Sequence, residues 1–163
     1  MRKEELSVIK KAIINELEGY EFYRMAAAQA HEEDVKSALK ELAEEEQKHI
    51  VWLDELFNKI KNEPTDDFQL ASLEDMPSPG IFTWDTLDRK HLGLAVSVFG
   101  IAIQMEKASM EFYKKASEYT NIPAAKELFI TLSKWEEVHM NIFAEEYDRL
   151  QGDWWSDQGY APF

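Results

Sequence analysis

The chain has 163 residues, of which 45 % are apolar, so it can bury a sizeable core as one domain. Its 32 Asp and Glu against 18 Lys and Arg give a formal charge of −14, which argues against nucleic acid or an anionic membrane surface as a partner. The absence of cysteine excludes disulfides, thiolate zinc sites and iron–sulfur ligation. No signal-peptide core follows the charged N-terminus and no run is long enough to span a bilayer, so we expect a cytoplasmic protein.

Four stretches of the chain carry apolar side chains at the spacing of an amphipathic helix. The first two form a predicted helical hairpin over residues 4–61, with a tight turn at residues 30–34. The last two form a second predicted hairpin over residues 87–150, with a tight turn at residues 119–123. No segment alternates apolar and polar residues for long enough to predict a strand, so the sequence predicts an all-α protein.

The segment between the hairpins, residues 62–86, is long and rich in proline. An extended chain of this length reaches beyond the roughly 40 Å of a bundle helix, so the segment can cross the whole bundle. We therefore expect the second and third helices to run parallel. Residues 151–163 form an aromatic C-terminal tail, which we expect to be ordered against the bundle or a neighbouring chain. The predicted architecture is one domain over residues 1–163.

An internal repeat relates the two hairpins, because the chain matches itself without a gap when it is shifted by 90 residues. The matched pairs include Ala12 and Ala102, Glu16 and Glu106, Tyr23 and Tyr113, Glu46 and Glu136, and His49 and His139. Each half thus has the same residues at the same steps, which predicts a four-helix bundle made of two pseudo-symmetric hairpins.

Four of the repeated residues are carboxylates on apolar stripes: Glu16, Glu46, Glu106 and Glu136. Each lies at helical spacing from apolar residues, so all four should point into the bundle at one level. Four unpaired buried charges would cost many kcal/mol, so something positive should sit among them.

His49 and His139 identify the positive partner as metal. Each follows an inward Glu by three residues, so the two side chains share one helix face. Glu-x-x-His on two helices, with one Glu on each of the others, is the ligand set of carboxylate di-metal bundles. Four carboxylates balance two divalent ions, and mixed oxygen and imidazole ligands suit iron, or manganese as an alternative, better than zinc. We expect two iron ions.

At these residues the sequence resembles the rubrerythrin branch of the ferritin-like superfamily, over about residues 4–150. The matching motifs are Glu16-Leu-Glu-Gly19-Tyr-Glu-Phe22-Tyr23, Glu46-Gln-Lys-His49, Glu106-Lys-Ala-Ser109-Met-Glu-Phe112-Tyr113 and Glu136-Glu-Val-His139. The resemblance implies a ferritin-like fold and a di-iron centre bridged by Glu46 and Glu136, with Glu16 and Glu106 more terminal. It also implies that Tyr23 and Tyr113 donate hydrogen bonds to the carboxylates, although both also fit as amphipathic core aromatics.

The chain departs from the rubrerythrin pattern in three ways. It lacks the four-cysteine rubredoxin-like iron site, so electrons would come from another protein. Ser109 stands where rubrerythrins usually have an extra glutamate, and His139 stands where they often have a carboxylate. The resulting set looks more like the ferroxidase centre of bacterioferritins, and we expect a nearly symmetric site.

Three functions fit these observations. The leading one is an oxidoreductase that reduces hydrogen peroxide or dioxygen with electrons from an external donor protein, a role in oxidative stress. The alternative is a ferroxidase for iron storage or detoxification. The third is a binding module in which the metal serves only to stabilise the fold. We expect a homodimer with no nucleic-acid or membrane partner.

Overall fold

The computed structural model describes residues 2–31, 33–61 and 93–157, without the side chains at 2, 34, 93–95, 153–155 and 157. These residues form four helices and no strand. The helices are α1 (Arg2–Gln29), α2 (Glu33–Lys61), α3 (Gly93–Tyr119) and α4 (Pro123–Asp157). The all-α prediction is therefore confirmed for the described part of the chain.

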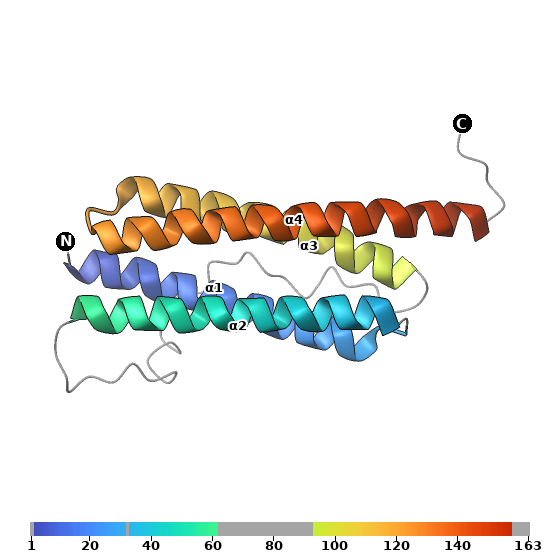
Figure 1. Cartoon of the computed structure of the whole chain (residues 1–163), viewed down its shortest axis with the longest axis horizontal. Coiled ribbons are helices and arrows are strands. Elements are labelled where there is room, and N and C mark those ends of the chain that lie inside the picture. The colour runs from blue at the N-terminus through green and yellow to red at the C-terminus, as the bar shows by residue number, and fades with distance from the viewer. Residues whose placement is uncertain (1, 32, 62–92, 158–163) are drawn as a thin grey trace.

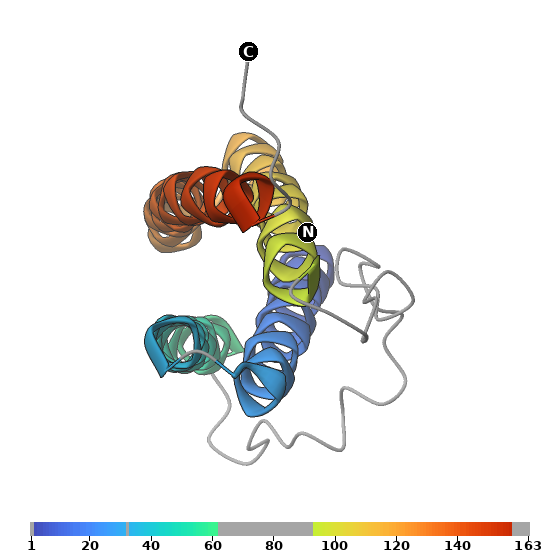
Figure 2. The same ribbon diagram turned by 90° about the vertical axis from the view of Figure 1, so that its right-hand side faces the viewer.

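The helices form two antiparallel hairpins, α1 with α2 and α3 with α4 (Figure 1). Helices α2 and α3 run in the same direction, as the prediction of a long crossover between them requires. Seen end-on, α1 lies beside α3 on one side of the bundle, while α2 and α4 lie on the opposite side (Figure 2). The fold is the predicted four-helix bundle, and it brings all four helices around one axis.

Helix boundaries agree with the sequence at some points and differ at others. Helix α2 ends at Lys61 as predicted, but α4 runs seven residues past the expected end at Leu150, to Asp157. The first part of the predicted tail is therefore helical. Gly152 weakens a helix but does not have to end it, and a Cβ there would meet nothing within 4 Å. The predicted crossover at 62–86, the start of the second hairpin at 87–92 and the tail at 158–163 lie outside the described residues.

The turn between α3 and α4 is tied to the first turn of α1 by a buried carboxylate. Glu5 accepts hydrogen bonds from the Thr120 hydroxyl at 2.7 Å and from the Asn121 backbone N–H at 3.1 Å. The Thr120 hydroxyl oxygen in turn accepts from the Ile122 N–H at 3.2 Å. Glu5 thus accepts hydrogen bonds from a hydroxyl and a backbone N–H just before the start of α4. It thereby connects the first hairpin to the second.

Two apolar clusters fill the bundle, one towards each end. The first gathers side chains from the start of α1, the end of α2, the end of α3 and the start of α4, with Ile13, Leu53, Phe129 and Leu132 fully buried. The second gathers side chains from the opposite ends of the same helices, with Phe22, Phe99, Ala102 and Phe143 at its centre. On every helix, the predicted ligand residues lie between these two clusters along the chain, so the polar layer is closed by apolar side chains above and below.

Candidate metal centre

All six residues singled out from the repeat lie in the middle of the bundle and are almost completely buried. Glu16 comes from α1, Glu46 and His49 from α2, Glu106 from α3, and Glu136 and His139 from α4. None of the six is more than 2 % exposed. Ionisable groups are this deeply buried only when other groups compensate their charge, so the layer needs an internal balance or a bound cation.

The six residues form two overlapping groups. Glu16, Glu46, His49 and Glu136 offer ligand atoms that lie within 4.8 Å of one another, and so do Glu46, Glu106, Glu136 and His139. Glu46 and Glu136 belong to both groups, whereas the other four residues belong to one group each. Such an arrangement could hold two adjacent metal ions with two carboxylates between them.

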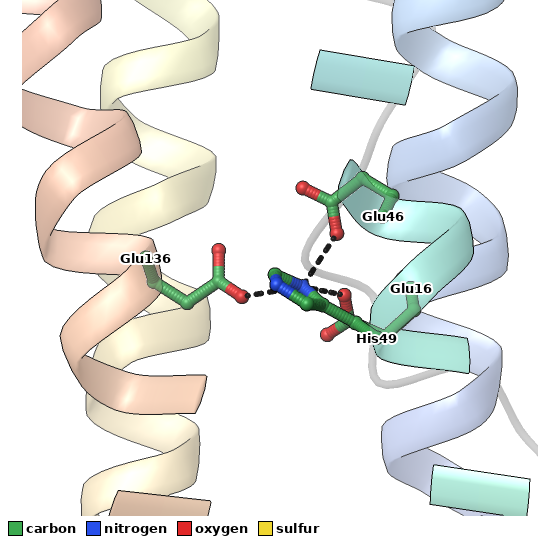
Figure 3. Close-up of side chains that lie close together, drawn as sticks. All are labelled: Glu16, Glu46, His49 and Glu136. Carbon is green, nitrogen blue, oxygen red and sulfur yellow. Dashed lines mark hydrogen bonds and ion pairs between the residues drawn. The ribbon is translucent and has the colours of Figure 1, made fainter. Parts of the chain in front are cut away.

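His49 lies at the centre of the first group. Its Nδ1 atom is 3.0 Å from Glu16 Oε2, 3.4 Å from Glu46 Oε2 and 3.4 Å from Glu136 Oε1. Figure 3 shows the three carboxylates pointing at the imidazole from α1, α2 and α4. One nitrogen therefore meets oxygens from both hairpins, which places the group across the interface between them.

His139 has the corresponding place in the second group. Its Nδ1 atom lies 3.5 Å from Glu46 Oε1, 3.7 Å from Glu136 Oε2 and 3.8 Å from Glu106 Oε2. The two imidazole rings stack with their centroids 5.7 Å apart and an interplanar angle of 19°. The two halves of the site thus face each other across the bundle axis, as the repeat requires.

Two tyrosines connect the site to the apolar clusters. The Tyr23 hydroxyl on α1 donates to Glu106 Oε1 on α3, and the Tyr113 hydroxyl on α3 donates to Glu16 Oε1 on α1. Both side chains are fully buried, and each stacks on a phenylalanine, Tyr23 on Phe143 and Tyr113 on Phe129. Each hairpin therefore supplies a hydrogen-bond donor to the carboxylate of the other.

Burial and the neighbouring groups raise the pKa of two of the four carboxyl groups and lower the pKa of the other two. Burial, with the charge of Glu46, raises the pKa of Glu16 from an ordinary 4.5 to about 8. Burial and the charges of Glu46 and Glu106 raise the pKa of Glu136 well above its usual value. Burial opposes ionisation of Glu46 as well, but contacts with Glu16 and both histidines outweigh it and lower the pKa to about 2. Burial is also outweighed at Glu106, whose pKa is lowered by Glu136 and His139.

The same surroundings favour protonation of the two imidazoles. Burial alone would lower the pKa of each histidine, but the carboxylates around them raise it, to about 12 for His139 and further for His49. Near neutral pH the site then holds two carboxylic acids, two carboxylates and two imidazolium ions, which leaves it without net charge. The four added protons neutralise the negative charge of the four carboxylates, and two divalent cations would carry the same positive charge.

Several polar atoms of the layer have no hydrogen-bond partner among the described residues. They are Glu46 Oε1, Glu106 Oε2, Glu136 Oε1, His49 Nε2, His139 Nδ1 and His139 Nε2. Buried polar atoms are normally paired, so a concentration of unpaired oxygen and nitrogen atoms in one place fits a site for cations. The donor set of carboxylates and imidazoles suits iron or manganese.

Sequence reasoning missed one polar contact beside this layer. Asn15 Nδ2 donates to Ser109 Oγ at 3.0 Å and lies 3.5 Å from Glu16 Oε1. The six repeated residues form two groups of the same composition, but the surroundings of these two groups differ. The available signal was Asn15 directly before a predicted ligand, but its repeat equivalent is Met105, so a search for repeated polar residues does not detect it.

A bundle of two helical hairpins with Glu on two helices and Glu-x-x-His on the other two defines the ferritin-like class of proteins. Within this class the chain belongs to the rubrerythrin family, whose model matches residues 7–147. No curated protein matches the chain.

Solved structures with a similar fold include the following two. A hypothetical protein from Pyrococcus furiosus is 24 % identical, with a TM-score of 0.72 over 91 % of this chain and 90 % of that one. A dodecameric thioferritin, the bacterioferritin-related protein from Bacteroides fragilis, is 17 % identical, with a TM-score of 0.67 over 94 % and 91 % of the two chains. At these identities the likeness concerns the fold alone. Among the described helices, none is long and apolar enough to cross a membrane.

Proposed function

We propose that Glu16, Glu46, His49, Glu106, Glu136 and His139 bind two iron ions, with manganese as the alternative metal. The observation that carries this proposal is the pair of overlapping, fully buried groups that have Glu46 and Glu136 in common. Two shared carboxylates keep two cations adjacent, and each histidine with its own unshared Glu distinguishes one position from the other.

We further propose that the protein is an oxidoreductase that reduces hydrogen peroxide or dioxygen. The bound iron pair would supply two electrons, which together with two protons reduce hydrogen peroxide to two water molecules or dioxygen to hydrogen peroxide. The chain has no cysteine, so a cysteine-ligated relay within it is excluded and the electrons come from an external donor protein.

The chain's own residues would prepare the site for this chemistry. The apolar clusters on both sides exclude bulk water from the layer. The hydroxyls of Tyr23 and Tyr113 keep a proton at Glu106 Oε1 and Glu16 Oε1, and their own pKa values are raised well above the ordinary value of 10.0, first by burial and then by the carboxylates. They therefore stay protonated at neutral pH and hold the unshared carboxylates in place.

Rapid mixing of anaerobically iron-loaded, reduced protein with each oxidant tests the proposal. We expect the iron absorbance to change with both peroxide and dioxygen, and repeated turnover to require an added electron donor. Protein carrying both Glu46→Ala and Glu136→Ala should bind no adjacent pair and react with neither. Reaction with peroxide alone would favour a peroxidase, whereas an unreactive wild-type centre would contradict oxidoreductase function.

A second candidate is iron oxidation for storage or detoxification. It draws support from the fold shared with a protein described as a dodecameric thioferritin. Storage requires a large hollow assembly, so this function predicts a high oligomer and iron far beyond two ions per chain. Size measurement and iron analysis on the same anaerobically purified sample separate the two functions, because a homodimer with two ions per chain would rule storage out.

A further inference from the structure

Beside Glu16 lies a pair of buried polar residues that has no polar equivalent in the 90-residue repeat. Asn15 on α1 and Ser109 on α3 are each 1 % exposed and joined by the 3.0 Å hydrogen bond from Asn15 Nδ2 to Ser109 Oγ. Their equivalents in the repeat are Met105 and Gly19, which are also buried but bring no polar side-chain group to the other half. Only one of the two unshared carboxylates thus has a polar pair at its side.

The consequence is that the two unshared carboxylates are held differently. Glu16 has Tyr113 and the Asn15 amide, 3.5 Å away, at Oε1, and His49 Nδ1 at 3.0 Å from Oε2. Glu106 has Tyr23 at Oε1, but its Oε2 has no hydrogen-bond partner among the described residues and lies 3.8 Å from His139 Nδ1. Glu16 is fixed through both oxygens, whereas Glu106 is fixed through one.

Packing alone does not account for an amide at position 15. The Asn15 Oδ1 atom is buried and has no hydrogen-bond partner in the described part of the chain, which is an unfavourable state for an amide oxygen. Met105 shows that the equivalent position in the other hairpin accepts an apolar side chain. The contacts that distinguish Asn15 are those of its NH₂ group with Ser109 and Glu16.

We propose that Asn15 and Ser109 are positioning residues that hold the Glu16 carboxylate in one orientation and thereby make the two metal positions unequal. This inference rests on the proposed two-metal site. A ligand that is already oriented loses less freedom on binding, and hydrogen bonds to ligands tune metal affinity. The position of Glu16 and His49 therefore fills first. The position of Glu106 and His139 fills second and exchanges its ion more readily.

Two tryptophans allow each position to be followed separately. The Trp52 ring lies 5.6 Å from the His49 ring, and the Trp135 ring lies 6.4 Å from the His139 ring, centroid to centroid. A Trp135→Phe variant keeps the reporter beside His49, and a Trp52→Phe variant keeps the reporter beside His139. The other three of the five tryptophans give a background common to both variants.

The experiment is an anaerobic titration of the metal-free full chain with Co²⁺, a paramagnetic ion that quenches nearby indole fluorescence. We expect the first equivalent to quench Trp52 and the second to quench Trp135. Asn15→Leu and Ser109→Ala should each reduce the preference for the first position about tenfold, the usual scale for partners of metal ligands. Ser109→Thr keeps the hydroxyl and should retain the order. Met105→Leu, at the repeat equivalent of Asn15, is the matched control and should leave the order unchanged.

The outcomes separate this inference from the proposed function. Two bound ions with both reporters responding together, or with the same order in Asn15→Leu and Ser109→Ala, would overturn the role of the pair and leave the two-metal site standing. Filling of the His139 position before the His49 position would also overturn the proposed role of Asn15 and Ser109. Uptake of a single ion by the wild-type chain would instead contradict the proposed two-metal site itself. Circular dichroism on each variant confirms that the bundle has formed.

Discussion

Tyr113 on α3 donates its hydroxyl hydrogen bond to Glu16 on α1, while the repeat-related Tyr23 on α1 donates to Glu106 on α3. The two contacts exchange donors between the hairpins, so each unshared carboxylate receives its tyrosine hydrogen bond from the other half of the bundle. The site is consequently a property of the assembled bundle and not of either hairpin alone.

Replacing Tyr113 with Phe should weaken both the fold and the proposed metal site. Loss of a hydrogen bond to a buried carboxyl oxygen costs about 1–3 kcal/mol of unfolding free energy, and loss of a ligand's partner lowers metal affinity about tenfold. Denaturant unfolding of the metal-free protein and metal titration measure the two effects. Tyr20→Phe, on the half-buried surface of α1, is the control and should change neither. Equal unfolding free energies and metal affinities of the two variants would show that the Tyr113 hydrogen bond does not contribute to either.

The shared and unshared carboxylates should respond differently to removal. Glu46→Ala or Glu136→Ala takes an oxygen donor from both groups, so both ions should bind more weakly. Glu16→Ala or Glu106→Ala takes a donor from one group only, so one ion should remain tightly bound. Equilibrium dialysis followed by metal analysis gives the stoichiometry, with exposed Glu44→Ala as the control on the same helix as Glu46. Identical losses in all four variants would mean that the ions do not share Glu46 and Glu136.

The sequence predicted the helices and the six ligand candidates because both obey repeating patterns. Apolar residues recur at helical spacing, and Glu16, Glu46 and His49 return 90 residues later, so chance matches are filtered out. The parallel course of α2 and α3 followed from the length of the connection between them. These features depend on periodicity and chain length, which a single sequence contains.

Features that break the pattern could not be predicted in this way. The Asn15–Ser109 hydrogen bond joins residues 94 positions apart whose repeat equivalents have no polar side chain, so it depends on how α1 packs against α3. The predicted helix end at Leu150 was wrong, because α4 continues through Gly152 to Asp157; a glycine weakens a helix but does not have to end it. The crossed pairing of the tyrosines required the three-dimensional arrangement of the hairpins.

Metal binding should release protons in a number that depends on pH. At neutral pH the metal-free site holds protons on Glu16, Glu136, His49 and His139, because the pKa of each is raised by its surroundings. Two divalent ions need these ligands deprotonated, so about four protons should leave below pH 8 and about three above it, where Glu16 is already ionised. Calorimetric titration with Co²⁺ in buffers of different ionisation enthalpy counts them. Release of one proton or fewer at neutral pH would contradict the proton-balanced site.

The last prediction concerns the stability of the metal-free protein as a function of pH. Glu16 has a pKa of about 8 in the folded protein against an ordinary 4.5, so between these values the folded state binds more protons than the unfolded chain. The free energy of unfolding therefore falls as pH rises from 4.5 to about 8. Glu136 acts in the same direction, and so do the two histidines above their ordinary 6.5.

Glu46 and Glu106 act in the opposite direction, because their pKa values are lowered and their stabilisation is lost as pH falls below 4.5. The metal-free protein should thus be most stable in mildly acidic solution, and added metal should raise the melting temperature most at high pH, where protons no longer compete. Urea unfolding with chelator across this range measures the slope. Glu16→Gln should flatten it, while Gln at the exposed Glu44 should not. A metal-free wild type whose stability rises from pH 4.5 to pH 8 would show that the buried layer does not hold these protons.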